Sequence, residues 1–200
     1  MIVVFTDSSS SRKFSSLGSA CIIYKVKEVD FLNNNFKNKE ELFKIQIGFK
    51  STIKIGSGEM IGVLFALEWL IENNFINEKI ILYSDSEYTI KELDKINGWW
   101  KGHFLKRFID IKNKELIINI VYKLSLFKNI SLFHVKGHTG KQDFASLGNN
   151  EVDILARAAH REDEGADLND LFDYFEFIQE INKENQEENY FNKIYQTLNI

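Results

Sequence analysis

The sequence has a single cysteine and no proline. Cys21, alone in a chain of 200 residues, cannot take part in a disulfide framework or a thiolate metal site. It lies in an apolar, strand-like segment, so we interpret it as a small core residue. The absence of proline is unusual, but it indicates no particular function.

Long uncharged apolar runs are also missing. No segment approaches the roughly 18 uncharged apolar residues that indicate a membrane-spanning helix. The first residues do not have the basic segment that precedes the apolar part of a secretory signal. We therefore expect a soluble, cytoplasmic protein that does not associate with membranes.

Charge is divided unevenly along the chain, although the net charge is only -4. Residues 162–200 contain 11 acidic residues and 2 lysines, a net charge of -9. Residues 1–161 contain 18 acidic and 23 basic residues, a net charge of +5. A basic body followed by an acidic extension suggests a polyanionic partner for the body.

Short apolar runs and helical periodicities predict an α/β fold. Strands are predicted over residues 1–5, 19–27, 42–55, 79–83 and 130–136. Helices are predicted over residues 59–71, 86–96, 113–127 and 150–160, with Ser57 as an N-cap of the first. Residues 8–18 are predicted to form a polar turn, and residues 30–41 a solvated loop. This order of elements predicts a mixed sheet with helices on both faces.

The acidic extension has apolar residues at helical spacing. Its first stripe contains Leu168, Leu171, Phe172, Phe175 and Ile178, which predicts one or two amphipathic helices. A lone helix of this length is marginal in water, so the stripe needs a partner surface. Two interpretations remain open: the extension packs on the body, or it contacts nucleic-acid-binding residues or another protein.

Four acidic residues lie where predicted strands end or predicted helices begin. Asp7 and Asp85 follow apolar strands, whereas Glu59 and Asp153 fall in the first turns of predicted helices. Each has an ordinary alternative, since Asp is a good cap and Glu is favourable near a helix N-terminus. Strand ends and helix starts can nevertheless meet at one edge of a mixed sheet.

Four carboxylates brought together would repel one another unless cations neutralise them. Oxygen ligands alone favour Mg²⁺ or Mn²⁺ over Zn²⁺. Two such ions about 4 Å apart could hold the attacking and leaving oxygens of a phosphodiester. The basic and aromatic stretch GWWKGHFLKRFIDIKNK, residues 98–114, is suited to a nucleic-acid backbone.

Together, these motifs resemble the type I ribonuclease H family over about residues 1–161. The matching pieces, in the family's order, are TDSS, GEM, YSDSEYTIKEL, WWKGHFLKR, KNKEL, VKGHTG and NNEVDILARAAH. The resemblance implies a ribonuclease H-like fold in the α/β class, a five-stranded mixed sheet flanked by helices, here with a C-terminal helical extension over 162–200. It also implies a metal-dependent endonuclease that cleaves the RNA strand of RNA·DNA hybrids and leaves 5′-phosphomonoesters.

The resemblance implies catalytic roles for five residues. Asp7, Glu59, Asp85 and Asp153 match the family's metal-binding carboxylates, which are expected to hold two Mg²⁺ ions, with Mn²⁺ as a substitute. His138 matches a mobile loop histidine that assists proton transfer and product release. Its ordinary alternative is a surface turn residue.

The resemblance also implies contacts to nucleic acid. Trp100 and Lys101 match the part that grips the DNA strand, Asn113 a residue that holds a DNA phosphate, and Asn150 a residue near the substrate. Each asparagine could instead cap a helix. Ser8 stands where the family usually has a glycine whose backbone approaches the RNA. Departures of this kind bear on hybrid selectivity rather than on hydrolysis.

The leading interpretation is an active, monomeric ribonuclease H whose partner is an RNA·DNA hybrid. A proofreading exonuclease of the same fold is disfavoured, because that branch begins with D-x-E and Asp7 is followed by two serines. The alternative from another class is a non-catalytic nucleic-acid-binding domain. Binding alone has no use for four clustered acids.

Overall fold

The computed structural model describes residues 1–11, 16–50, 55–98 and 114–159. The predictions for Trp100, Lys101 and Asn113, and those for the extension over 162–200, lie outside the described residues. The division of the chain at residue 161 stays a prediction.

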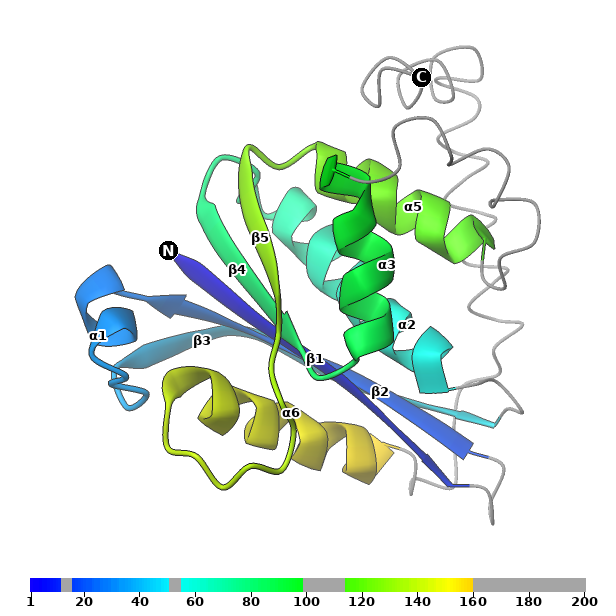
Figure 1. Ribbon diagram of the computed structural model, residues 1–200, viewed down its shortest axis with the longest axis horizontal. Coiled ribbons are helices and arrows are strands. Elements are labelled where there is room, and N and C mark those ends of the chain that lie inside the picture. Colours follow the sequence, from blue (N-terminus) through cyan, green and yellow to red (C-terminus); the bar gives the residue numbers. More distant parts are fainter. Residues whose placement is uncertain (12–15, 51–54, 99–113, 160–200) are drawn as a thin grey trace.

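Five strands form one mixed sheet in the spatial order β3-β2-β1-β4-β5 (Figure 1). The first three strands are antiparallel neighbours, whereas β4 runs parallel to β1 and β5 parallel to β4. The bounds are β1 Ile2–Ser11, β2 Ser16–Val26, β3 Lys39–Lys50, β4 Lys79–Ser84 and β5 Asn129–His134. The predicted five-stranded mixed sheet is therefore confirmed.

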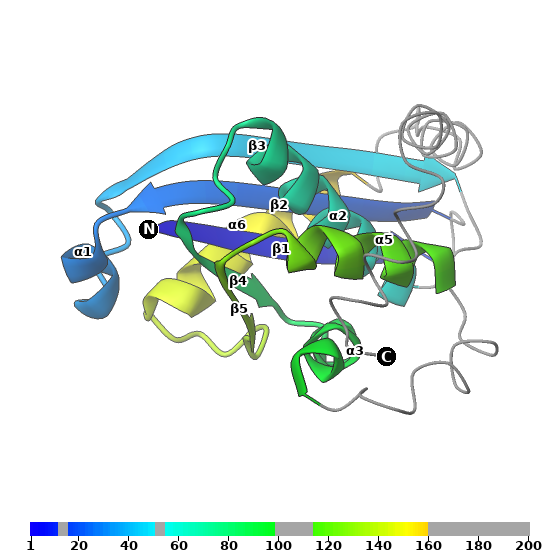
Figure 2. The same cartoon turned by 90° about the horizontal axis from the view of Figure 1, so that it is seen from above.

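Helices cover both faces of this sheet. On one side lie α2 (Ile55–Glu72), α3 (Glu87–Gly98) and α5 (Lys114–Ser125), and on the other lies α6 (Phe144–Ala159), as Figure 1 and Figure 2 show. The short helix α1 (Glu28–Leu32) joins β2 to β3, within a segment largely predicted as loop. Among the described residues, no helix is long and apolar enough to cross a membrane.

The alternation of side chains along β1 supplies a core on each face of the sheet. Ile2 and Val4 pack in a cluster with α2 and α5, whereas Val3 and Phe5 pack with α6. A central strand buried on both faces is what a continuous apolar run predicts. α6 approaches the sheet at Gly148, where a Cβ atom would lie 2.1 Å from the ring of Phe5. This approach holds α6 against β1.

The serine-rich segment after the first apolar run continues the sheet instead of forming a polar turn. β1 reaches Ser11 and β2 begins at Ser16, with Ser8 opposite Ser19 in the antiparallel ladder. The predicted turn is therefore wrong for residues 8–11 and 16–18, which are strand, whereas residues 12–15 lie outside the described residues. Strand preference depends on cross-strand neighbours and burial more than on the residue type. Cys21, on β2, is free and buried, as predicted.

The helix that carries Glu59 begins earlier than predicted. α2 starts at Ile55, so Ser57 lies inside the helix rather than at its N-cap. Glu59 consequently lies beyond the first turn, which contains no acidic residue. The interpretation of Glu59 as a partner of the helix dipole is therefore wrong, because that effect is confined to the first turn.

The helix that carries Asp153 also begins earlier, at Phe144. Asp143 caps it, since its Oδ1 accepts a hydrogen bond of 2.8 Å from the backbone N–H of Ser146. Asn150 lies inside the helix, which excludes the capping role considered for it. Asp153 lies in the middle of α6, not in its first turn.

Candidate metal centre

Three of the predicted carboxylates meet at one place. β1 and β4 are parallel neighbours with Thr6 opposite Ser84. Asp7 therefore lies next to Asp85, although Asp7 is inside β1 and not at the strand end predicted for it, whereas Asp85 does follow the last residue of β4. Glu59 reaches them from α2, which packs on β1. One carboxylate oxygen from each acid lies within 4.8 Å of the others. We call Asp7, Glu59 and Asp85 the acidic cluster.

Two of the three acids in the cluster are buried, and among the described residues serines donate hydrogen bonds to Glu59. Asp7 is 4% exposed and Glu59 3%. The backbone N–H of Ser8 donates to Asp7 Oδ1 at 2.7 Å and to Glu59 Oε1 at 3.0 Å. The hydroxyl of Ser8 donates to Glu59 Oε1 at 2.9 Å, and that of Ser84 to Glu59 Oε2 at 3.3 Å. The side chain of Ser8 is thus directed at Glu59.

No lysine or arginine among the described residues forms an ion pair with the acidic cluster. Burial raises the pKa of Asp7 to about 8, with further contributions from the charges of Asp85 and Asp153, while the Ser8 N–H acts in the opposite direction. Burial, then the charge of Asp7, raises the pKa of Glu59 well above its usual range. Buried carboxylates of this kind take up protons or bind a cation.

Asp153 lies beside the cluster but not in it. The residue is 8% exposed, and its carboxylate forms an ion pair with Arg157, one turn further along α6. It is not among the acids whose oxygens lie within 4.8 Å of one another. Its charge nevertheless contributes to the raised pKa of Asp7. The structure therefore gathers three of the four predicted carboxylates and places the fourth nearby.

His138 lies on an exposed turn after β5, with a backbone φ of 54°. The preceding residue, Gly137, packs directly on the cluster, since a Cβ atom there would lie 2.7 Å from Asp85 Oδ2. Only glycine fits this approach without displacing the carboxylate. The turn therefore carries His138 next to a residue that contacts the acidic cluster.

Sequence reasoning selected Asn150 and overlooked its neighbour Asn149. Asn149 precedes Asp153 by four residues, so the two share one face of α6. It is 2% exposed, and its Oδ1 has no hydrogen-bond partner among the described residues. Asn150 is half-buried. The spacing to Asp153 is the signal that distinguishes the two asparagines.

Two other residues near the cluster were not selected from the sequence. Ser84 contacts Glu59, as described above, and His134 Nε2 lies 3.0 Å from the backbone oxygen of Asp85. The available signal was position alone: Ser84 immediately precedes Asp85, and His134 ends the strand beside β4.

Comparison with known proteins identifies relatives of this arrangement. The model of a family described as RNase H matches residues 1–161. The probable ribonuclease H of Acanthamoeba polyphaga mimivirus is 32% identical over 107 residues, which cover 50% of this chain and 45% of that protein. Ribonuclease H1 of Rattus norvegicus is 34% identical over 89 residues, 44% of this chain and 29% of that one. The chain thus matches less than half the length of these curated relatives.

Solved structures share the fold at lower identity. The PFV RNase H domain has a TM-score of 0.61 at 21% identity, over 80% of this chain and 94% of that domain. A foamy viral protease-reverse transcriptase in complex with an RNA/DNA hybrid has a TM-score of 0.56 at 18% identity, over 80% of this chain and 20% of that one. At these identities the likeness shows the fold alone.

Proposed function

The chain belongs to the ribonuclease H family, and on that premise we propose that it is an active ribonuclease H. It hydrolyses the RNA strand of RNA·DNA hybrids with the help of divalent metal ions and leaves 5′-phosphomonoesters. The observation that carries this proposal is the acidic cluster: three carboxylates, two of them almost fully buried, without a basic partner among the described residues. A domain that only bound nucleic acid would be destabilised by such a cluster and would gain nothing from it.

The donor atoms of the cluster suit Mg²⁺, with Mn²⁺ as a substitute. All are carboxylate oxygens, which hard divalent cations prefer, and none is a thiolate or imidazole. Two ions, held by Asp7, Glu59 and Asp85 with Asp153 as the fourth carboxylate, would supply charge stabilisation for the attacking and leaving oxygens of a phosphodiester. Asp153 is suited to this role because it lies near enough to Asp7 to raise its pKa.

The protein's own groups then have distinct tasks. The carboxylates hold negative charge at fixed positions, and Ser8 and Ser84 orient Glu59. His138, on its exposed turn, moves a proton at the leaving oxygen, since an imidazole can both accept and donate a proton. This role does not require His138 to bind metal.

Substrate selectivity belongs to the surface around the cluster. We propose that Ser8, Trp100, Lys101, Asn113 and Asn150 contact the hybrid, with 2′-hydroxyl groups marking the RNA strand. The solved foamy viral complex with an RNA/DNA hybrid supports a nucleic acid of this class for a protein of this fold. A monomeric state and a cytoplasmic location also stay predictions.

The test is cleavage of a hybrid whose RNA strand carries a label, with Mg²⁺ and with a chelator. Double-stranded DNA and double-stranded RNA of the same sequence are the substrate controls. We expect Mg²⁺-dependent cleavage of the hybrid alone. Folded protein that binds the hybrid but leaves the RNA intact in Mg²⁺ and in Mn²⁺ would favour the non-catalytic alternative.

A further inference from the structure

Glu59 is held on both of its carboxylate oxygens. Oε1 accepts two hydrogen bonds from Ser8, one from the backbone at 3.0 Å and one from the hydroxyl at 2.9 Å. Oε2 accepts one from the hydroxyl of Ser84 at 3.3 Å. Ser8 belongs to β1 and Ser84 to β4, so residues of two neighbouring strands hydrogen-bond to the side chain of Glu59, which comes from α2.

A second feature brings α2 close enough for this contact. Gly58 immediately precedes Glu59, and a Cβ atom at this position would lie 2.8 Å from Ser8 Cβ. It would also lie 3.0 Å from a methyl group of Leu17. The missing side chain at position 58 therefore allows the helix to rest on Ser8, so that the Ser8 hydroxyl reaches Glu59.

We propose that Ser8 and Ser84 are positioning residues that hold Glu59 ready for a divalent ion and thereby raise the affinity of the acidic cluster for Mg²⁺. This inference rests on the proposed function of the cluster as a metal site. It assigns Ser8 a task other than the contact with RNA that its place in the chain implies.

The physical reason is preorganisation. A free glutamate has several side-chain torsions, and ordering it costs conformational entropy. The negative charges of Asp7 and Asp85 also drive the Glu59 carboxylate away from the cluster. Hydrogen bonds to an ionised carboxylate are stronger than neutral ones and oppose both effects. Because the serines order Glu59 during folding, less of this cost remains when an ion binds.

The experiment measures metal binding by the full chain without nucleic acid, by calorimetric titration with MgCl₂. We expect Ser8→Ala to weaken Mg²⁺ binding about tenfold, which corresponds to about 1.4 kcal/mol. Ser84→Ala should weaken it about threefold, because its hydrogen bond is longer. Ser8→Thr keeps the hydroxyl and should restore nearly normal affinity. Ser131→Ala, at an exposed position of β5, is the matched control.

A merely structural role predicts a different result. The hydroxyls would then affect only the melting temperature of the metal-free protein, and the alanine variants would bind Mg²⁺ as the wild type does, which would overturn the inference. In cleavage assays, positioning predicts that saturating Mg²⁺ restores the turnover of Ser84→Ala, since Ser84 is assigned no contact with the hybrid. A turnover that stays low at every Mg²⁺ concentration, with unchanged metal binding, would also overturn it.

Gly58→Ala provides a route that leaves both hydroxyls in place. Its new Cβ should displace Ser8 and weaken Mg²⁺ binding, and combining it with Ser8→Gly should add little to Ser8→Gly alone. Full additivity in this cycle would contradict the inference even if Ser8→Ala did not fold. A wild-type protein that binds no Mg²⁺ would instead contradict the proposed function itself.

Discussion

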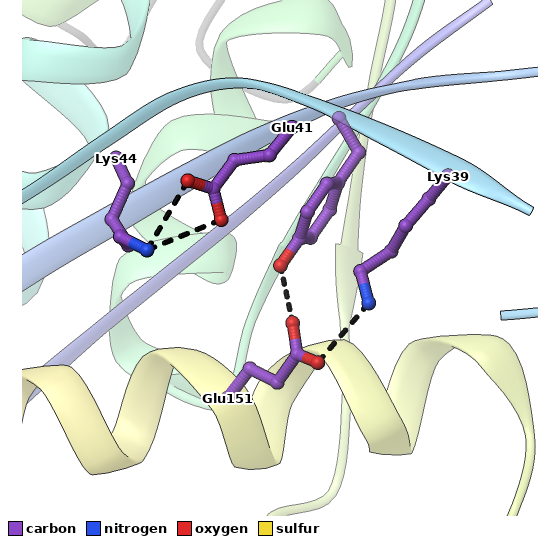
Figure 3. A network of polar contacts seen from close by, with 5 residues as sticks. Lys39, Glu41, Lys44 and Glu151 are labelled. Atoms are coloured by element: carbon purple, nitrogen blue, oxygen red, sulfur yellow. Dashed lines mark hydrogen bonds and ion pairs between the residues drawn. The ribbon is translucent and has the colours of Figure 1, made fainter. Parts of the chain in front are cut away.

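Acidic side chains in two regions of this protein have opposite surroundings. Glu151, on α6, accepts a hydrogen bond from the hydroxyl of Tyr24 and forms an ion pair of 3.1 Å with Lys39. Beside it, Glu41 pairs with Lys44 at 3.1 Å, both on β3, whereas the Glu151–Lys39 pair joins α6 to β3 (Figure 3). The acidic cluster has no such partner among the described residues.

These four residues, Lys39, Glu41, Lys44 and Glu151, form what we call the ion-paired region. It is more accessible to solvent than the acidic cluster. It borders a hollow of about 490 Å³, and the side chain of Glu151 is 41% exposed. Lys39 lies over the ring of Phe36, 3.7 Å from its centre, and is thus held by an aromatic ring as well. Solvent would already screen the charged side chains of this region, and they are nevertheless paired with one another.

The two most deeply buried acids, Asp7 and Glu59, are left without a cation among the described residues. Stability alone would favour the reverse arrangement, because a buried charge costs most when it has no partner. Asp153 falls between these extremes, since it is buried but forms an ion pair with Arg157. Because no lysine or arginine among the described residues pairs with the cluster, the comparison supports the proposal that it binds a cation.

The largest expected effect is a loss of cleavage activity, which should follow from substitutions in the acidic cluster but not in the ion-paired region. Asp7→Asn or Asp85→Asn should abolish cleavage of a hybrid at saturating Mg²⁺, because each removes a charge that holds the ions. Hybrid binding, measured by fluorescence anisotropy, should persist or improve as repulsion of the phosphates falls. Glu151→Gln, the matched control in the ion-paired region, should cleave at nearly the wild-type rate. Wild-type turnover in either cluster variant would refute the assignment.

The next effect concerns the turn that lies against the cluster. His138→Ala should slow turnover by about 10²-fold or less, the low end of general acid–base effects. Mg²⁺ affinity, measured by titration, should not change, since His138 is assigned no metal. Loss of both activity and metal binding would place His138 among the ligands instead.

Stability without metal should depend on pH in a direction set by the cluster. The pKa of Asp7 is about 8 in the folded protein against 3.8 ordinarily, so the folded state binds this proton more tightly than the unfolded chain. The contribution of Asp7 is therefore fully present below about pH 4 and is lost as the pH rises through 8. Melting temperatures of the metal-free protein should fall between pH 5 and pH 9.

Two additions sharpen this experiment. Mg²⁺ should raise the melting temperature more at pH 8 than at pH 5, because ions bind the folded, deprotonated cluster. Asp7→Asn should remove much of the pH dependence and stabilise the metal-free protein. A melting temperature insensitive to Mg²⁺, to pH and to this substitution would show that the acids do not interact as the geometry requires.

The smallest expected effect is a loss of stability, opposite in sign to the stabilisation expected for Asp7→Asn. Glu151→Gln removes the partner of Lys39 and should destabilise the protein by about 0.2–1 kcal/mol, the range of partly exposed ion pairs. Urea unfolding of this variant and of Asp7→Asn, both without metal, gives the comparison directly. Equal effects of the two substitutions would show that the cluster and the ion-paired region do not differ in kind.

The sequence alone determined the features that depend on local pattern. Continuous apolar runs at the starts of β1 and β4 predict buried strands, and an acid follows each run at Asp7 and Asp85. Burial of those runs requires a sheet covered on both faces, which the alternation of later helices and strands supplies. The mixed sheet and two members of the cluster could therefore be anticipated from neighbouring residues.

Only the tertiary structure decided which side chains meet. Ser8 and Glu59 are 51 residues apart in sequence and Ser84 and Glu59 are 25 apart, so no local periodicity predicts their hydrogen bonds. Strand register decides that the serine run belongs to the sheet. The packing of α6 on the sheet decides that Asp153 lies beside the cluster rather than in it. Local patterns depend on burial and spacing along the chain, whereas partners depend on how separate elements pack.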